Sequence, residues 1–219
     1  MGSSLLQLIA LAAVAIYLVF RLRNTLGTRD GFENPTRRTP RTPQVHSSPS
    51  EPEEAEVDYE ITQFADAGSS TAIALAAMKQ AEPGFSVEDF VAGARAAYEQ
   101  ILIGFAKGEI EDLKPFLALE VYESFKETVD ARNQEGHSYE AKFVGLRETK
   151  LVNAEIDAAD SRAEIGMQFV GEVISYVTDA EGNIVEGDPE TIRRQRDSWI
   201  FARRMGSSDP NWELVATGE

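Results

Sequence analysis

The sequence SVEDFVAGARAAYEQILIGFAKG, residues 86–108, decides the fold of this chain. Ser86 precedes Asp89 by three positions, which resembles a capping box in which Asp replaces the usual Glu. Apolar side chains then recur at steps of three and four, at Phe90, Ala94, Ala97, Ile101 and Phe105. This pattern predicts a central buried helix that runs to about Lys107 and ends at Gly108.

Weaker helical patterns lie on both sides of this segment. Residues 70–81, STAIALAAMKQA, are helix-prone and unusually apolar. The large apolar members are Ile73, Leu75 and Met78. They leave no clean polar face, so the segment is either core or a surface for a membrane or a partner. Residues 109–117 are typical of a short helix or turn, and residues 119–132 of a further helix that Gly136 ends.

Beyond Gly136 the apolar period changes from about 3.6 to about 2, which is typical of strands. Two long strand-like runs, residues 139–157 and 162–178, meet at the turn-rich sequence DAADS. Residues 192–204 alternate likewise, and a last short strand is expected at 212–216. Helices followed by antiparallel strands indicate an α+β fold.

We therefore expect the helices to pack on one face of a curved four-stranded antiparallel sheet. Gly145, Gly166 and Gly171 mark places where the strands bulge or bend. A bent sheet around a helix leaves a cone-shaped cavity, which is a natural place for an apolar ligand or side chain. The side chains expected to line it are Phe90, Tyr98, Ile101, Phe105, Ile165, Met167, Phe169, Trp199 and Phe201.

The N-terminus has the pattern of a membrane anchor. Nineteen uncharged residues run from Gly2 to Phe20, and as a helix they would span about 28 Å, close to the hydrocarbon thickness of a bilayer. The anchor residues are Leu5, Leu8, Ile9, Val14, Ile16, Tyr17 and Phe20, with Arg21 and Arg23 as the basic stop. Because the arginines follow the apolar run, the N-terminus is expected outside, and the rest of the chain in the cytoplasm or, for a mitochondrial protein, the matrix.

Residues 1–23 therefore form the anchor, and residues 24–69 are expected to be a disordered, Pro-rich linker. The linker is basic in its first half and acidic in its second. The acidic residues are Glu51, Glu53, Glu54, Glu56, Asp58 and Glu60, interpreted as solubilising charge. The folded domain is expected to span residues 70–219.

Composition argues against several classes of function. The formal net charge is −16, which disfavours a nucleic-acid partner. The chain has no cysteine, and His46 and His137 are its two histidines, so we expect no metal and no cofactor. Acidic residues in 179–190 have a faint likeness to a calcium loop, but the ligand pattern is incomplete and two hairpin turns explain the segment better.

Catalysis would need a carboxylate near Tyr98, and the strand patterns show no inward Asp, Glu or His. Five arginines, at 193, 194, 196, 203 and 204, fall within twelve residues. They either contact lipid headgroups or an acidic partner, or pair across strands with Glu164 and Glu172. The residues proposed for a partner or lipid surface are Ile73, Leu75, Met78, Arg194, Arg196 and Arg204.

Three stretches resemble the Tim44-like domain family, and specifically its membrane-anchored alphaproteobacterial members of the TimA type. They are YLVFRLRNTLGTRDGFE after the anchor, FVAGARAAYEQILIGFAKGEIEDLKPFL at 90–117, and DSWIFARRMGSSDPNWELVAT at 197–217. The resemblance implies a cone similar to that of nuclear transport factor two. It also implies an adaptor without catalysis, as in the mitochondrial member that tethers the import motor's heat-shock chaperone to the import channel and touches inner-membrane lipid.

That member has a long, charged, helical N-terminal region where an anchor and a Pro-rich linker are expected here, so chaperone tethering is the least transferable property. The combined expectation is a non-catalytic adaptor at the cytoplasmic face of a bacterial inner membrane, recruiting proteins for transport or assembly and contacting lipid. An alternative is a carrier or enzyme for an apolar small molecule in the cone. A third is a membrane-bound subunit of a larger assembly that docks through residues 70–81.

Overall fold

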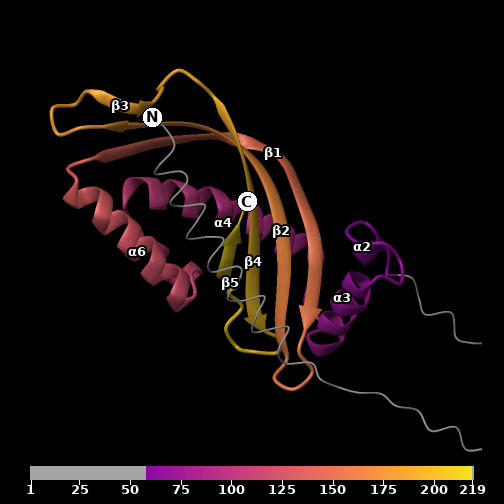
Figure 1. The fold of residues 1–219 in the computed structure, drawn as a ribbon. Coiled ribbons are helices and arrows are strands. Elements are labelled where there is room, and N and C mark those ends of the chain that lie inside the picture. Colours follow the sequence, from indigo (N-terminus) through magenta and orange to yellow (C-terminus); the bar gives the residue numbers. More distant parts are fainter. Residues whose placement is uncertain (1–57, 219) are drawn as a thin grey trace, which may run out of the picture.

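The computed structural model describes residues 58–218, in which helices lie along one side of an antiparallel sheet (Figure 1). The predicted anchor residues and most of the predicted linker lie outside this range. No helix within residues 58–218 has the length and apolar character needed to cross a bilayer. The predicted α+β class, with helices packed on an antiparallel sheet, is confirmed for this range.

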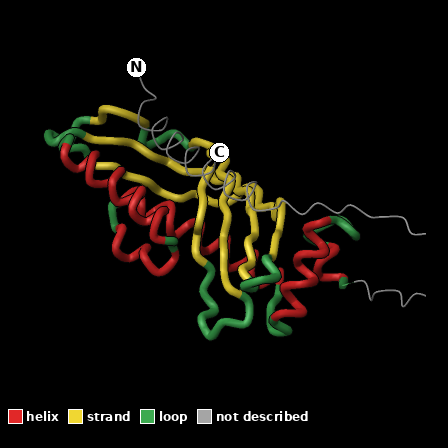
Figure 2. Tube along the Cα trace, turned by 60° about the horizontal axis from the view of Figure 1, so that its bottom comes forward, coloured by secondary structure: helices red, strands yellow, loops and turns green. Residues whose placement is uncertain are grey.

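The helices come first in the chain and the strands follow. The helices are α2 (Tyr59–Thr62), α3 (Ser70–Ala81), α4 (Val87–Lys107), α5 (Ile110–Leu113) and α6 (Leu119–Gln134), with a 3-10 turn at Lys114–Phe116. The strands are β1 (Ser138–Ile156), β2 (Arg162–Thr178), β3 (Ile184–Gly187), β4 (Arg193–Arg204) and β5 (Glu213–Gly218). Figure 2 shows α4 and α6 along the sheet, with α2 and α3 beyond one end of it.

Helix α4 begins and ends where the sequence pattern predicts. The Ser86 hydroxyl accepts a hydrogen bond from the Asp89 amide at 3.1 Å. Gly108 adopts a left-handed conformation (φ 77°) that lets its own amide cap the carbonyls of the last turn. At that end, Arg132 of α6 donates from Nη2 to the carbonyls of Phe105 and Ala106 at 2.7 and 2.8 Å, which joins the two helices.

The sheet has five strands, so the prediction of four is wrong. The main path runs β1-β2-β4-β5 in antiparallel order, and β3 pairs with β2 beyond the start of β4. Both turns predicted in residues 179–190 are present, with φ of 84° at Gly182 and 82° at Gly187. The four residues between them were missed because so short a strand has too little alternation to show a period.

The bends in the sheet fall where the glycines predict them. The β1–β2 register shifts beside Gly145 and again beside Asn153, which lies opposite Gly166. At position 171, close packing explains the glycine, because a Cβ atom there would lie 2.7 Å from the Tyr98 hydroxyl. The missing side chain lets the central helix rest directly on β2.

The folded domain begins before residue 70, which corrects the predicted linker boundary. Residues 59–62 form α2, and Ile61 is buried in the same core as α3 and α4. Asp58 caps α2 by accepting hydrogen bonds from the amides of Glu60 and Ile61. A single buried apolar residue with its cap is too small a pattern to stand out against the acidic linker.

Candidate functional site

The side chains predicted to line a cone cavity come together in the interior, as their periodicity implies. Tyr98 of α4 stacks on Phe169 of β2 with ring centres 4.5 Å apart, and lies 4.9 Å from Trp199 of β4. Phe90 meets Phe201 edge-on at 6.0 Å. Ile101, Ile165 and Met167 are buried in the same cluster, and Phe105 packs against it half-buried. These side chains belong to the hydrophobic core, so side chains packed ring against ring occupy this part of the expected cone.

An inward carboxylate lies beside Tyr98, so the prediction that the strands carry none is wrong. The Tyr98 hydroxyl donates to Asp197 Oδ2 at 2.6 Å, and Gln195 Nε2 donates to the same oxygen at 2.9 Å. Asp197 pairs with Phe169 in the β2–β4 register. Its position follows from the alternation of Trp199 and Phe201, because one step of two residues backwards reaches it.

Burial and the neighbouring charge of Asp197 raise the pKa of the Tyr98 hydroxyl above its ordinary value. The hydroxyl therefore stays protonated and acts as a hydrogen-bond donor. Tyr98 is 0% exposed, so in this structure its hydroxyl meets protein and not a dissolved substrate. The pair joins α4 to the sheet through a partly buried hydrogen bond.

A second polar cluster fixes the N-terminal segment to the domain; we call it the junction, formed by Asp58, Glu60, Lys79 and Ser86. Lys79 Nζ pairs with Asp58 at 2.7 Å and with Glu60. The other Glu60 oxygen accepts from the Ser86 hydroxyl at 2.7 Å and from the Glu88 amide at 2.9 Å. The carboxylate of α2 thus completes the cap of α4.

The electrostatics of the junction follow from these contacts. Burial alone would raise the pKa of Glu60, but hydrogen bonds from Lys79, the Glu88 amide and Ser86 outweigh it and lower the pKa to about 2. Asp58 also has a lowered pKa, chiefly through its hydrogen bond with Lys79. Two acidic residues interpreted from sequence as linker charge are therefore structural.

The predicted surface on residues 70–81 is largely wrong. Leu75 and Met78 are 0% exposed and belong to the core, because α3 packs against β1. Ile73 is 64% exposed and is the member of the three that lies at the surface. The helix shows no clean polar face because apolar residues lie on both sides of it, with Leu75 and Met78 buried and Ile73 exposed.

The arginine-rich strand divides between the two faces of the sheet. Arg194 reaches Glu172 across the β2–β4 pair at 3.2 Å, and Arg147 of β1 reaches the same carboxylate at 2.8 Å. The cross-strand alternative is thus confirmed for Arg194, whereas Glu164 pairs with Arg162 on its own strand. Arg204 lies 3.6 Å from Asp160.

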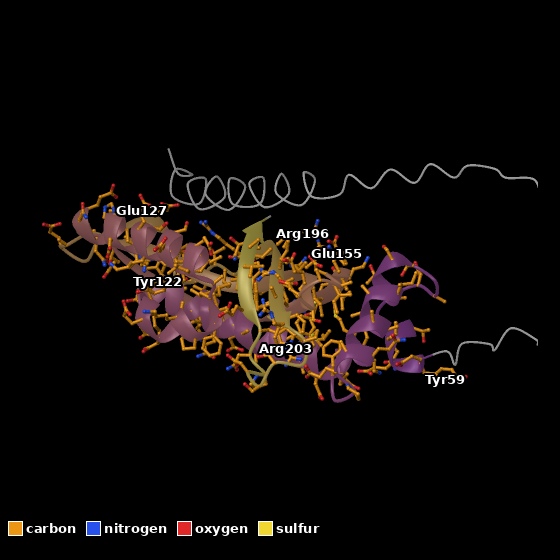
Figure 3. All side chains as sticks on the ribbon, turned by 90° about the horizontal axis from the view of Figure 1, so that it is seen from below. Tyr59, Tyr122, Glu127, Glu155, Arg196 and Arg203 are labelled. Atoms are coloured by element: carbon orange, nitrogen blue, oxygen red, sulfur yellow. The ribbon has the colours of Figure 1, made fainter. Side chains whose placement is uncertain are left out.

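Arg203 points the opposite way from Arg196 (Figure 3). Its side chain is 7% exposed, donates to Glu82 at 2.7 Å and lies 5.4 Å from the ring centre of Trp212. It therefore ties the α3–α4 loop to the β4–β5 loop. Arg196 is exposed on the outer face, together with Glu155.

Within residues 58–218, no group of three or more His, Cys, Asp or Glu side chains is arranged to hold a metal ion. The Asp179 carboxylate instead accepts from the amides of Glu181 and Asn183, at 3.1 and 2.8 Å. These are the contacts of a tight turn. Among residues 58–218, the structure shows a buried hydrophobic core together with exposed apolar and charged side chains.

Comparison with known proteins identifies the family of the domain. The profile described as the Tim44-like domain matches residues 71–219. A similar protein is the mitochondrial import inner membrane translocase subunit TIM44-1 of Arabidopsis thaliana, 26% identical over 124 residues. The match covers 57% of this chain and 26% of that protein, so it spans about a quarter of the relative's length.

Among solved structures, the intermembrane space region of the chloroplast protein ARC6 is similar at 16% identity with a TM-score of 0.38. That match covers 56% of this chain and 88% of the other. A likeness this distant carries no argument about function.

Proposed function

Because the chain belongs to the Tim44-like domain family, we propose that it is a membrane-anchored adaptor that recruits other proteins. The folded domain would lie at the cytoplasmic face of a bacterial inner membrane and serve protein transport or membrane assembly without catalysing a reaction. The observation that carries this proposal is the order of the chain: an apolar run with arginines behind it, followed by a Tim44-like domain.

The junction supports this arrangement. Glu60 binds Lys79 of α3 and the Glu88 amide of α4. These contacts attach the start of the domain, which follows the N-terminal segment, to the helices of the core. If residues 24–57 behave as a random coil, they would give the domain a reach of roughly 30 Å from the membrane. A tethered domain with such reach can meet partners without lying on the lipid.

The packing of the interior bears on the alternative function. A carrier or enzyme for an apolar molecule needs space between the rings of α4 and the sheet. Tyr98, Phe169 and Trp199 instead contact one another, and the Tyr98 hydroxyl is engaged by Asp197. These contacts favour the adaptor, whose surfaces and not its interior make the functional contacts.

Fractionation of cells tests the anchor. The full chain should stay with the membrane pellet after alkaline carbonate extraction, and deletion of residues 2–20 should release it. A matched control replaces Arg21 and Arg23 with Gln, which should keep the chain in the pellet while weakening its orientation. Full-length chain in the carbonate supernatant would contradict the proposal.

A pull-down tests recruitment. The full chain, solubilised from membranes, should enrich a reproducible set of proteins over a chain truncated after residue 57, which lacks the domain. An enriched set identical for both chains would show that the domain recruits nothing.

A further inference from the structure

The segment from Asp179 to Ile192 combines exposed apolar side chains with a single sign of charge; we call it the acidic hairpin. Ile184, Val185 and Ile192 are 50, 52 and 52% exposed. The segment carries Asp179, Glu181, Glu186, Asp188 and Glu190, and no Lys or Arg. Three half-exposed β-branched residues in fourteen positions are an unusual surface for a charged hairpin.

The backbone of β3 adds a second feature. In the described part of the chain, β3 pairs with β2 alone, at Tyr176–Thr178. Its other edge, at the margin of the sheet in Figure 1, is therefore available for a further strand. The β2–β3 register shifts at Val185, between the pairs Val177–Glu186 and Thr178–Ile184, so Ile184 and Val185 do not follow strict alternation, and both side chains are about half exposed.

The hairpin is preorganised. Gly187 allows β3 to approach β2, because a Cβ atom there would collide with the backbone of Ser175 and Tyr176. Asp179 and Asp188 accept amide hydrogen bonds within their own turns. A strand that adds to this edge would not need to order it first, which lowers the cost of binding.

The carboxylates of the acidic hairpin indicate which kind of chain could bind the open edge of β3. Two copies that met edge to edge through β3 would bring ten carboxylates together, so self-pairing is opposed. The basic part of this chain's own N-terminal segment contains Pro35, Pro40 and Pro43, which lack the amide hydrogens that a strand needs. A basic segment of another protein that lacks proline has both the opposite charge and the amide hydrogens that strand pairing needs.

We propose that the open edge of β3 binds an extended segment of a partner protein in which basic and apolar residues alternate. The partner's backbone continues the sheet, its apolar side chains cover Ile184 and Val185, and its basic side chains face the carboxylates. This inference rests on the proposed adaptor function and gives the chemistry of what the adaptor recruits.

Peptide binding to the full chain in zwitterionic nanodiscs tests the proposal. The probe is a labelled seven-residue peptide of alternating Lys and Val. It should bind, bind more weakly as salt rises, and slow hydrogen exchange at the amides of Ile184–Gly187. A peptide with Glu for Lys, and one with a central Pro, should each bind about tenfold or more weakly.

Charge-matched variants locate the site. Replacing Glu181, Glu186 and Glu190 with Gln should weaken binding about tenfold, since three close charges are lost. Replacing Glu120, Glu123 and Glu127 of α6 with Gln changes the net charge equally and should leave binding within about twofold. Val185→Asp should also weaken binding, whereas Ile73→Asp, on α3, should not.

Equal loss in the two triple variants, or no protection of the β3 amides, would overturn the proposal and indicate non-specific attraction. Self-association that disappears in the Glu181, Glu186 and Glu190 variant would also overturn it, in favour of a second copy. The proposed function fails separately, if the full chain leaves the membrane on carbonate extraction while peptide binding persists.

Discussion

The junction and the acidic hairpin use the same residue types in opposite ways. At the junction, the Glu60 carboxylate binds Lys79, Ser86 and the Glu88 amide, so its charge is used in contacts within the domain. In the hairpin, Glu181 and Glu190 face solvent beside exposed Ile184 and Val185. Equal charges thus have unequal consequences: the first set stabilises the fold, and the second set is left for recognition.

The largest loss in the free energy of unfolding is expected for a change in the hydrophobic core. Tyr98→Ala should lower the free energy of unfolding by about 4 kcal/mol, because it removes a fully buried ring from contact with Phe169 and Trp199. Urea denaturation of the full chain in detergent measures the loss. Tyr98→Phe keeps the ring and should cost about 1 kcal/mol, through the lost hydrogen bond to Asp197. Equal costs would show that the hydroxyl and not the packing dominates.

A change at the junction should have the second largest effect on the free energy of unfolding. Glu60→Ala should lower the free energy of unfolding by about 2 kcal/mol, because it leaves Lys79 with one partner and the N-terminus of α4 without its carboxylate. The same denaturation experiment on Glu181→Ala provides the control, with a change within about 0.5 kcal/mol. If the two variants behave alike, the junction is not structural.

Acid should weaken the junction in a defined range. The pKa of Glu60 lies at about 2 in the folded chain, below its ordinary value of 4.5. Its contribution is therefore fully present above pH 4.5 and is lost as the pH falls towards 2. Stability measured across this range should fall more steeply for the natural chain than for Glu60→Gln. Parallel curves would place the pKa of Glu60 near its ordinary value.

The hairpin should show the smallest effect on folding. Replacing Glu181, Glu186 and Glu190 with Gln should change the free energy of unfolding by less than about 0.5 kcal/mol, since Glu181 and Glu190 are exposed and Glu186 is partly exposed. Thermal unfolding of this variant and of the matched α6 variant measures it. A large loss would mean that the hairpin, like the junction, uses its charges to hold the fold.

Features that depend on neighbouring residues agree with the predictions from sequence. The limits of α4 follow from Ser86 at one end and Gly108 at the other, and each acts on backbone groups within a few residues. The pairing of β1 with β2 follows from two long alternating runs around a tight turn. These features depend on neighbours along the chain, which a sequence displays directly.

Features that join distant residues were missed. The partners of Glu60 lie 19, 26 and 28 positions away, so no local pattern separates it from the acidic residues before it. Arg132 meets carbonyls 26 and 27 positions away. Asp197 was within reach, because the alternation that orients Trp199 extends to it, but a carboxylate there conflicts with an expected apolar interior.

We propose that the membrane anchor and the domain act together as an adaptor. In-cell crosslinking of the full chain, compared with the chain lacking residues 2–20, tests it most directly. We expect a discrete set of neighbouring membrane proteins that is present for the full chain and lost without the anchor. The same neighbours for both chains, or none for either, would contradict it.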